Sequence, residues 1–147
     1  MRLKSLRKNG VFKMESNIYR GKEFNLTKYI NNAAIKIHLF DDDIMRKARF
    51  TDNREGYWYY CRDLRPLCHG ISFNLSIKKD DPTDWRIDIL DEDFCQPYDY
   101  QAMIQHELDG EKFDGDFHWK VNEQVEYEME HLKRLGIITG WEKGDYI

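Results

Sequence analysis

The chain has 147 residues, enough for one domain with a buried core, and its 41% hydrophobic and 34% charged residues are typical of a folded protein. Nine Tyr, eight Phe and four Trp exclude a disordered chain, because these rings supply the apolar area that offsets chain entropy. No apolar run approaches the roughly 20 residues that span a bilayer, and three unpatterned cysteines are not a disulfide framework. We therefore expect a cytoplasmic protein without membrane contact.

The net charge of -4 conceals a strong segregation of charge along the chain. Residues 1–79 carry 17 Lys and Arg against 8 Asp and Glu, a net of +9, whereas residues 80–130 carry 3 against 17, a net of -14. Such segregation concerns the surface field and the partners of a protein rather than its fold.

The N-terminal residues 1–13 are basic and lack the apolar segment of a secretory signal, so we interpret them as a flexible basic arm. Met14 is a second candidate start of the chain. Residues 14–147 are interpreted as a single domain. Within it, residues 14–26 give only a weak strand prediction.

Alternation of apolar residues predicts a strand over residues 35–40, which ends at three consecutive aspartates. Residues 44–51 have an ambiguous period that leaves helix and strand open. A turn cluster ending at Gly56 follows, and the aromatic run at residues 57–62 predicts the next strand.

The clearest pattern in the sequence predicts a β-hairpin. Apolar residues alternate from Ile71 to Ile77 and again from Trp85 to Ile89, and the segment 79–84 between them is rich in aspartate and contains Pro82. Strict alternation on both sides of such a segment is typical of two antiparallel strands with one buried face.

Two helices are predicted after the strands. Pro97 suits a first helical turn, and residues 100–108 then show helical spacing up to Gly110. A second apolar stripe starts at Val121 and ends near Leu135 and Gly136, and a short strand or hairpin closes the chain. We predict an α+β fold, an antiparallel β-meander sheet of about four to six strands with the two C-terminal helices packed on one face.

The acidic block provides the first functional hypothesis, a non-catalytic module that binds protein. Carboxylates along helices and turns can imitate a phosphate backbone, as small inhibitors from phages and mobile elements do, and so engage a basic protein that handles nucleic acid. The predicted partner-binding residues are Asp80, Asp81, Asp84, Asp88, Asp114, Asp116, Glu123, Glu126 and Glu130.

The basic and aromatic N-terminal half supports an alternative, direct binding of nucleic acid. Cations would meet phosphates and rings would stack on bases. The residues of this alternative are Arg46, Lys47, Arg49, Trp58, Tyr60 and Arg62. A strand rich in exposed rings would also permit a homodimer.

A second alternative is a small metal-dependent hydrolase or nuclease that uses Asp88, Asp91 and Asp93. The cysteines and histidines lack zinc-ligand spacing, and Glu128 with His131 forms only one i, i+3 pair of the kind used in di-iron bundles. Motifs for nucleophilic catalysis or phosphate binding are absent from the sequence, so we predict no catalytic residue, no metal ligand and no cofactor.

Overall fold

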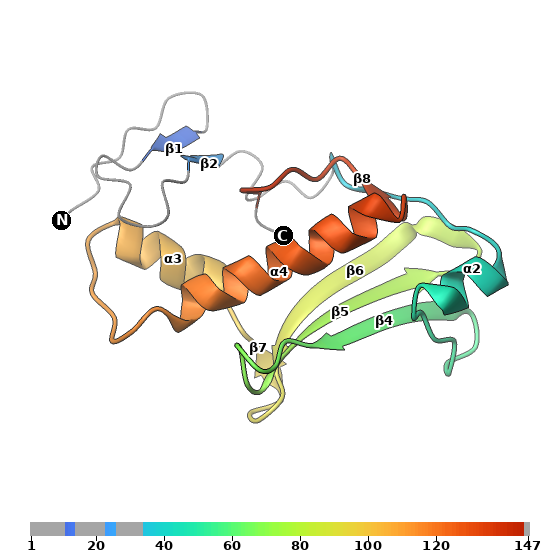
Figure 1. Cartoon of the computed structure of the whole chain (residues 1–147), viewed down its shortest axis with the longest axis horizontal. Coiled ribbons are helices and arrows are strands. Elements are labelled where there is room, and N and C mark those ends of the chain that lie inside the picture. The colour runs from blue at the N-terminus through green and yellow to red at the C-terminus, as the bar shows by residue number, and fades with distance from the viewer. Residues whose placement is uncertain (1–10, 14–22, 26–33, 146–147) are drawn as a thin grey trace.

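The computed structural model describes residues 11–13, 23–25 and 34–145. Its centre is an antiparallel sheet in which consecutive strands are neighbours, so the predicted meander is confirmed (Figure 1). The strands of this sheet are β4 (Tyr57–Asp63), β5 (Ile71–Lys78), β6 (Asp81–Asp91) and β7 (Gln96–Pro97).

The described chain also contains two two-stranded sheets. β3 (Lys36–Ile37) pairs antiparallel with β8 (Ile138–Thr139), and β1 (Val11–Lys13) pairs with β2 (Glu23–Asn25). The predicted strand over residues 35–40 is therefore much shorter than expected. The first ten residues of the predicted basic arm lie outside the described part of the chain.

In the β5–β6 hairpin the apolar side chains lie on the buried face, as predicted. Phe73, Leu75 and Ile77 are all buried. The turn is shorter than predicted, because β6 already begins at Asp81. Ile77 lies opposite Trp85 whereas Lys78 lies opposite Asp81, so the register shifts at this point. The extra residues of β6 form an irregularity next to the hairpin tip, as β-bulges do.

Helix α4 (Phe117–Arg134) runs across one face of the central sheet, and α3 (Tyr100–Leu108) packs against α4 (Figure 1). The α+β prediction is confirmed. Pro97 was wrongly assigned to a helical turn: it ends β7, and α3 begins at Tyr100, where the Asp99 side chain accepts a hydrogen bond of 3.2 Å from the Ala102 amide. This N-cap satisfies a donor that the first turn would leave unpaired.

The first half of residues 44–51, whose period was ambiguous, belongs to the short helix α2 (Asp42–Lys47). The carboxylate of Asp41 caps this helix by accepting from the Ile44 amide at 3.0 Å. Only Met45 of α2 is buried, so a helix of this length shows no readable apolar stripe.

A buried polar cluster joins α3 to α4. The indole Nε1 of Trp119 donates to Oε2 of Glu107 at 2.5 Å, and Nε2 of His118 lies 3.3 Å from the same oxygen. All three side chains are buried. A carboxylate in such a place is stabilised only while its partners remain, because an unpaired buried charge is costly.

The C-terminal segment contacts both α4 and the chain at β3. Glu126 is buried and accepts a hydrogen bond of 2.8 Å from the Gly144 amide. Gly140, beside β8, has φ of 82°, and a Cβ there would overlap the carbonyl oxygen of Ala34. Only glycine fits this conformation and this close approach without strain.

Candidate functional site: the cleft between α4 and β4

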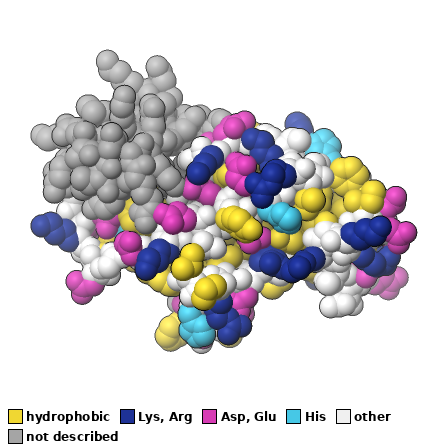
Figure 2. Space-filling view, in the orientation of Figure 1, with side chains coloured by type: hydrophobic (Ala, Val, Ile, Leu, Met, Phe, Trp, Pro, Cys, Tyr) yellow, Lys and Arg dark blue, Asp and Glu magenta, His cyan; other side chains and the backbone are white. Residues whose placement is uncertain are grey.

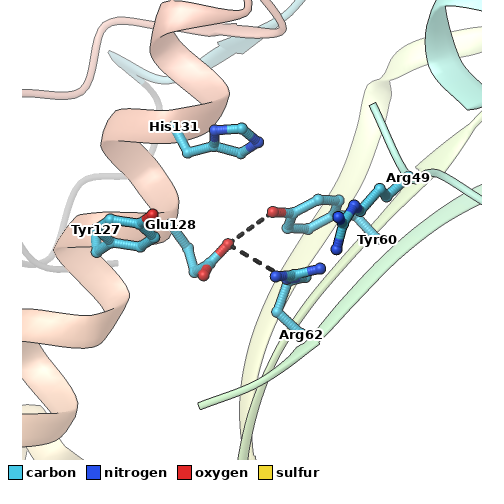
Figure 3. Close-up of a pocket in the computed structure, with 6 residues that line it drawn as sticks. All are labelled: Arg49, Tyr60, Arg62, Tyr127, Glu128 and His131. Carbon is cyan, nitrogen blue, oxygen red and sulfur yellow. Dashed lines mark hydrogen bonds and ion pairs between the residues drawn. The ribbon is translucent and has the colours of Figure 1, made fainter. Parts of the chain in front are cut away.

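A cleft of about 230 Å³ lies between the C-terminal half of α4 and the sheet (Figure 3). We call it the α4–β4 cleft. Its lining consists of Arg49, Tyr60, Arg62, Tyr127, Glu128 and His131.

Helical and strand periodicities bring these side chains together. Glu128 and His131 are three residues apart on α4 and therefore neighbours on one helix face. Tyr60 and Arg62 are two residues apart on β4 and share the sheet face that α4 covers. Figure 3 shows Glu128 and His131 extending toward the sheet, and Tyr60 and Arg62 extending toward the helix.

A buried hydrogen bond forms the floor of the cleft. The phenol of Tyr60 donates to Oε1 of Glu128 at 2.6 Å, and these residues are 2% and 6% exposed. The Nε atom of Arg62 lies 4.0 Å from the same oxygen. Burial, and secondly the bond to Glu128, raises the pKa of Tyr60 far above its usual value. Tyr60 therefore remains a donor at physiological pH.

Arg49 enters the cleft from an unusual backbone conformation. Its φ is 71°, in the left-handed region that residues with a side chain rarely adopt, and its amide donates to the carbonyl of Arg46 at 2.9 Å just after α2. Conformations of this kind often occur at binding sites, where the surrounding structure offsets their cost of roughly 1–3 kcal/mol.

The charges in the cleft favour an anion. Two guanidinium groups, from Arg49 and Arg62, are permanently positive, and His131 adds an imidazole. Glu128 offsets only one of these charges. Guanidinium groups are suited to carboxylates and phosphates, because their N–H donors match two oxygens of one ligand group.

The predicted acidic surface is not continuous. Asp80, Asp81 and Asp84 lie at the tip of the β5–β6 hairpin, at the right-hand end of Figure 1, whereas Asp114 and Asp116 lie in the α3–α4 loop at the left-hand end. On the face drawn in Figure 2, acidic and basic side chains are interspersed.

Other members of the acidic set are engaged within the chain. Glu126 is buried, so the sequence placed it wrongly on a partner-binding surface. Asp88 lies 2.9 Å from the Nε atom of the neighbouring Arg86. Glu123 and Glu130, on α4, are half-buried.

The two rings named in the nucleic-acid alternative are not exposed on the surface. Trp58 and Tyr60 are buried, so they cannot stack on bases from solution. Tyr57 and Tyr59 occupy the opposite sheet face, where their ring centroids lie 6.1 Å apart. Trp58 instead has the ammonium of Lys79 at 4.2 Å from its ring centroid.

The basic residues of that alternative do not form one surface either. Arg46 pairs with Asp52 at 3.0 Å, and Lys47 is exposed on α2. Arg49 and Arg62 line the cleft. Asp52 also binds Lys79 at 2.9 Å, and this hydrogen bond lowers the pKa of the Asp52 carboxyl.

In the described part of the chain, no group of three or more His, Cys, Asp or Glu side chains could hold a metal ion. Asp91, which the nuclease alternative required, is instead used in a turn, where its carboxylate accepts from the amides of Asp93 and Phe94 at 3.0 and 3.3 Å. Glu128 and His131 do lie together, but beside arginines rather than further ligands.

Sequence reasoning did not identify the cleft. Tyr127 is not among the predicted residues. Glu128 was assigned to the acidic block on the long helix and, with His131, to a possible metal motif. Two separate signals were available, the i, i+3 pair of Glu128 and His131 and the basic and aromatic set that contains Arg49, Tyr60 and Arg62. Periodicity could not join them, because Tyr60 and Glu128 are 68 positions apart in sequence.

No protein-family model matches the sequence, and no curated protein matches it. One similar solved structure is that of a DUF1831 family protein from Lactobacillus plantarum. It has a TM-score of 0.50 and 14% sequence identity, over 71% of this chain and 82% of that one. At this identity the likeness concerns the fold alone. Within the described residues, no helix combines the length and apolar character needed to cross a bilayer.

Proposed function

We propose that this chain is a non-catalytic binding module that recognises an anionic group, a carboxylate or phosphate, in the α4–β4 cleft. The observation that carries this proposal is the convergence of Arg49, Arg62 and His131 around the buried Tyr60–Glu128 pair. A fixed carboxylate beside Arg62 orients its guanidinium, which reduces the entropy lost when a ligand binds.

The test is a titration with acetate and with inorganic phosphate, followed by NMR chemical shifts of residues around the cleft. Wild-type protein should show saturable shifts there. Arg62→Gln should weaken binding by roughly 10-fold or more, because a charge-assisted hydrogen bond contributes about 1.5–3 kcal/mol.

Arg65→Gln provides a matched control. Arg65 lies just beyond the same strand, is exposed and pairs with Asp63, but does not line the cleft. Equal affinity of the Arg62→Gln and Arg65→Gln variants for the anion, or no saturable shift in wild type, would refute the proposal.

A second candidate function retains the acidic hypothesis but limits the binding surface to the tip of the β5–β6 hairpin. In this candidate the chain is an inhibitor of phage or mobile-element type, and it contacts a basic nucleic-acid-handling protein in the cytoplasm. The exposed position of Asp80, whose side chain is 81% accessible, favours this candidate. Reversing the charge of Asp80, Asp81 and Asp84 should abolish binding to such a partner in a pull-down, and unchanged binding would eliminate it.

A further inference from the structure

Glu128 places a negative group at the floor of a cleft whose other charged side chains are basic. Among the described residues, its Oε1 atom receives the hydrogen bond from Tyr60 and faces Arg62, whereas its Oε2 atom has no hydrogen-bond partner (Figure 3). A carboxylate can accept about four hydrogen bonds. Glu128 therefore retains acceptor capacity although the residue as a whole is almost fully buried.

A ligand that carries only an anion does not use this capacity. It would gain from Arg49 and Arg62 but would also be repelled by Glu128, and like charges close together in a site of low dielectric are unfavourable. A ligand with a positive N–H donor next to its anion uses both halves of the cleft.

We infer that the ligand of the α4–β4 cleft is a small zwitterion with the chemistry of a free α-amino acid, an inference that rests on the proposed function. Its carboxylate binds Arg49, Arg62 and His131, and its ammonium donates to Oε2 of Glu128. In an α-amino acid these two groups are attached to one carbon atom, with the nitrogen and the carboxyl carbon about 2.5 Å apart.

The size of the cleft agrees with this class of ligand. Its volume of about 230 Å³ is smaller than the roughly 300–1,000 Å³ of pockets for drug-sized ligands. A single amino acid matches this space better than a nucleotide. Tyr127, which is exposed, lies on the lining where it can contact the ligand side chain.

Matched ligands measure the contributions of the ammonium and of the carboxylate to binding separately. Each common α-amino acid is titrated by NMR, and the best binder is compared with its N-acetyl derivative, which lacks the ammonium, and with its amide, which lacks the carboxylate. We expect the free amino acid to bind at least about 10-fold more tightly than either derivative, since each loses a charge-assisted hydrogen bond.

Two variants test whether the carboxylate of Glu128 causes the preference for the free amino acid. Glu128→Gln should remove the advantage of the amino acid over its N-acetyl derivative, while affinity for the N-acetyl derivative is kept or increased. Glu130→Gln is the matched control, because Glu130 lies on the same helix but does not line the cleft. Thermal unfolding of both variants checks their folding.

The possible results distinguish the two proposals. Equal binding of the amino acid and its N-acetyl derivative overturns the zwitterion inference and leaves anion binding intact. Absence of binding by every carboxylate and by phosphate overturns anion binding itself. If Glu128→Gln does not fold, the comparison of probes on wild-type protein still decides, because it needs no variant.

Discussion

Two groups of carboxylates from the same acidic block have opposite surroundings in this fold. Glu107, Glu126 and Glu128 are buried, and each accepts a hydrogen bond from a specific donor: the Trp119 indole, the Gly144 amide and the Tyr60 phenol, respectively. The aspartates of the hairpin tip, Asp80, Asp81 and Asp84, are exposed.

The difference teaches that the charge of a sequence segment does not describe its surface. The hydrogen bonds of the three glutamates attach α3, the C-terminal segment and β4 to α4. The three aspartates make no contribution to the core. Buried groups with fixed partners determine stability, and exposed groups determine encounter with other molecules.

The largest expected effect on the free energy of unfolding is that of replacing Glu107, compared with replacing an exposed acid nearby. Glu107→Ala leaves Trp119 without this acceptor and His118 without its charged neighbour, and should lower the free energy of unfolding by about 3 kcal/mol. Glu111→Ala is the control, because Glu111 pairs with His106 at 2.9 Å on the surface. It should cost less than about 0.5 kcal/mol in the same urea titration. Similar losses for both would contradict the distinction.

The next effect concerns the floor of the cleft. Tyr60→Phe keeps the ring but removes the hydrogen bond to Glu128, and should cost about 2 kcal/mol at neutral pH. Urea unfolding of the two proteins measures the difference. A loss no larger than that of Tyr59→Phe, on the opposite face of β4, would mean that the bond is not stabilising.

The same pair predicts a dependence on alkaline pH. The pKa of Tyr60 is raised in the fold, so its contribution is complete below about pH 10, where the unfolded tyrosine is neutral, and declines at higher pH. Burial likewise raises the pKa of Cys68, to about 11, in both proteins. Wild type should therefore lose stability above pH 10 more steeply than Tyr60→Phe. Parallel profiles would contradict this.

A smaller effect is expected at Glu126, which accepts from the Gly144 backbone amide and, at 3.5 Å, from the side-chain amide of Asn122. Glu126→Ala removes the acceptor of the Gly144 amide and should cost about 1 kcal/mol. Hydrogen exchange at Gly144 should become faster, while amides in β5 remain protected. Glu130→Ala, on the same helix, should leave exchange at Gly144 unchanged, and faster exchange in both variants would indicate general destabilisation instead.

The smallest effect belongs to the exposed group. Reversing Asp80, Asp81 and Asp84 to lysine should leave the thermal unfolding midpoint within the error of the measurement. The Asp81 carboxylate accepts local hydrogen bonds from Thr83, which lower its pKa, but this turn contributes nothing to the core. A marked shift of the midpoint would show that the tip is structurally required.

The elements with a clear period were predictable from sequence. The β5–β6 hairpin followed from alternation, and in α4 the stripe Val121, Val125, Met129 and Leu132 is buried as expected. Leu135 is the exception, since it lies at the C-cap and is half exposed. Helix α2 has too few residues for a period to emerge.

The cleft could not be predicted, because it depends on contacts between distant segments. Glu126 and Glu128 are only two residues apart and were both read as part of a charged helix surface, yet one meets the C-terminal segment and the other meets β4. Arg49 has no sequence signature of its conformation, since left-handed positions usually carry Gly, Asn or Asp.

The pairing of β3 with β8 sets a condition on synthesis in the cell. The two strands are about 100 residues apart, and Gly140 fits closely against the backbone beside β3. At about 5–20 residues per second, the ribosome needs roughly 5–20 s to extend the chain from β3 to β8. During this interval β3 lacks the strand with which it pairs, so this two-stranded sheet forms only after α4 has been synthesised.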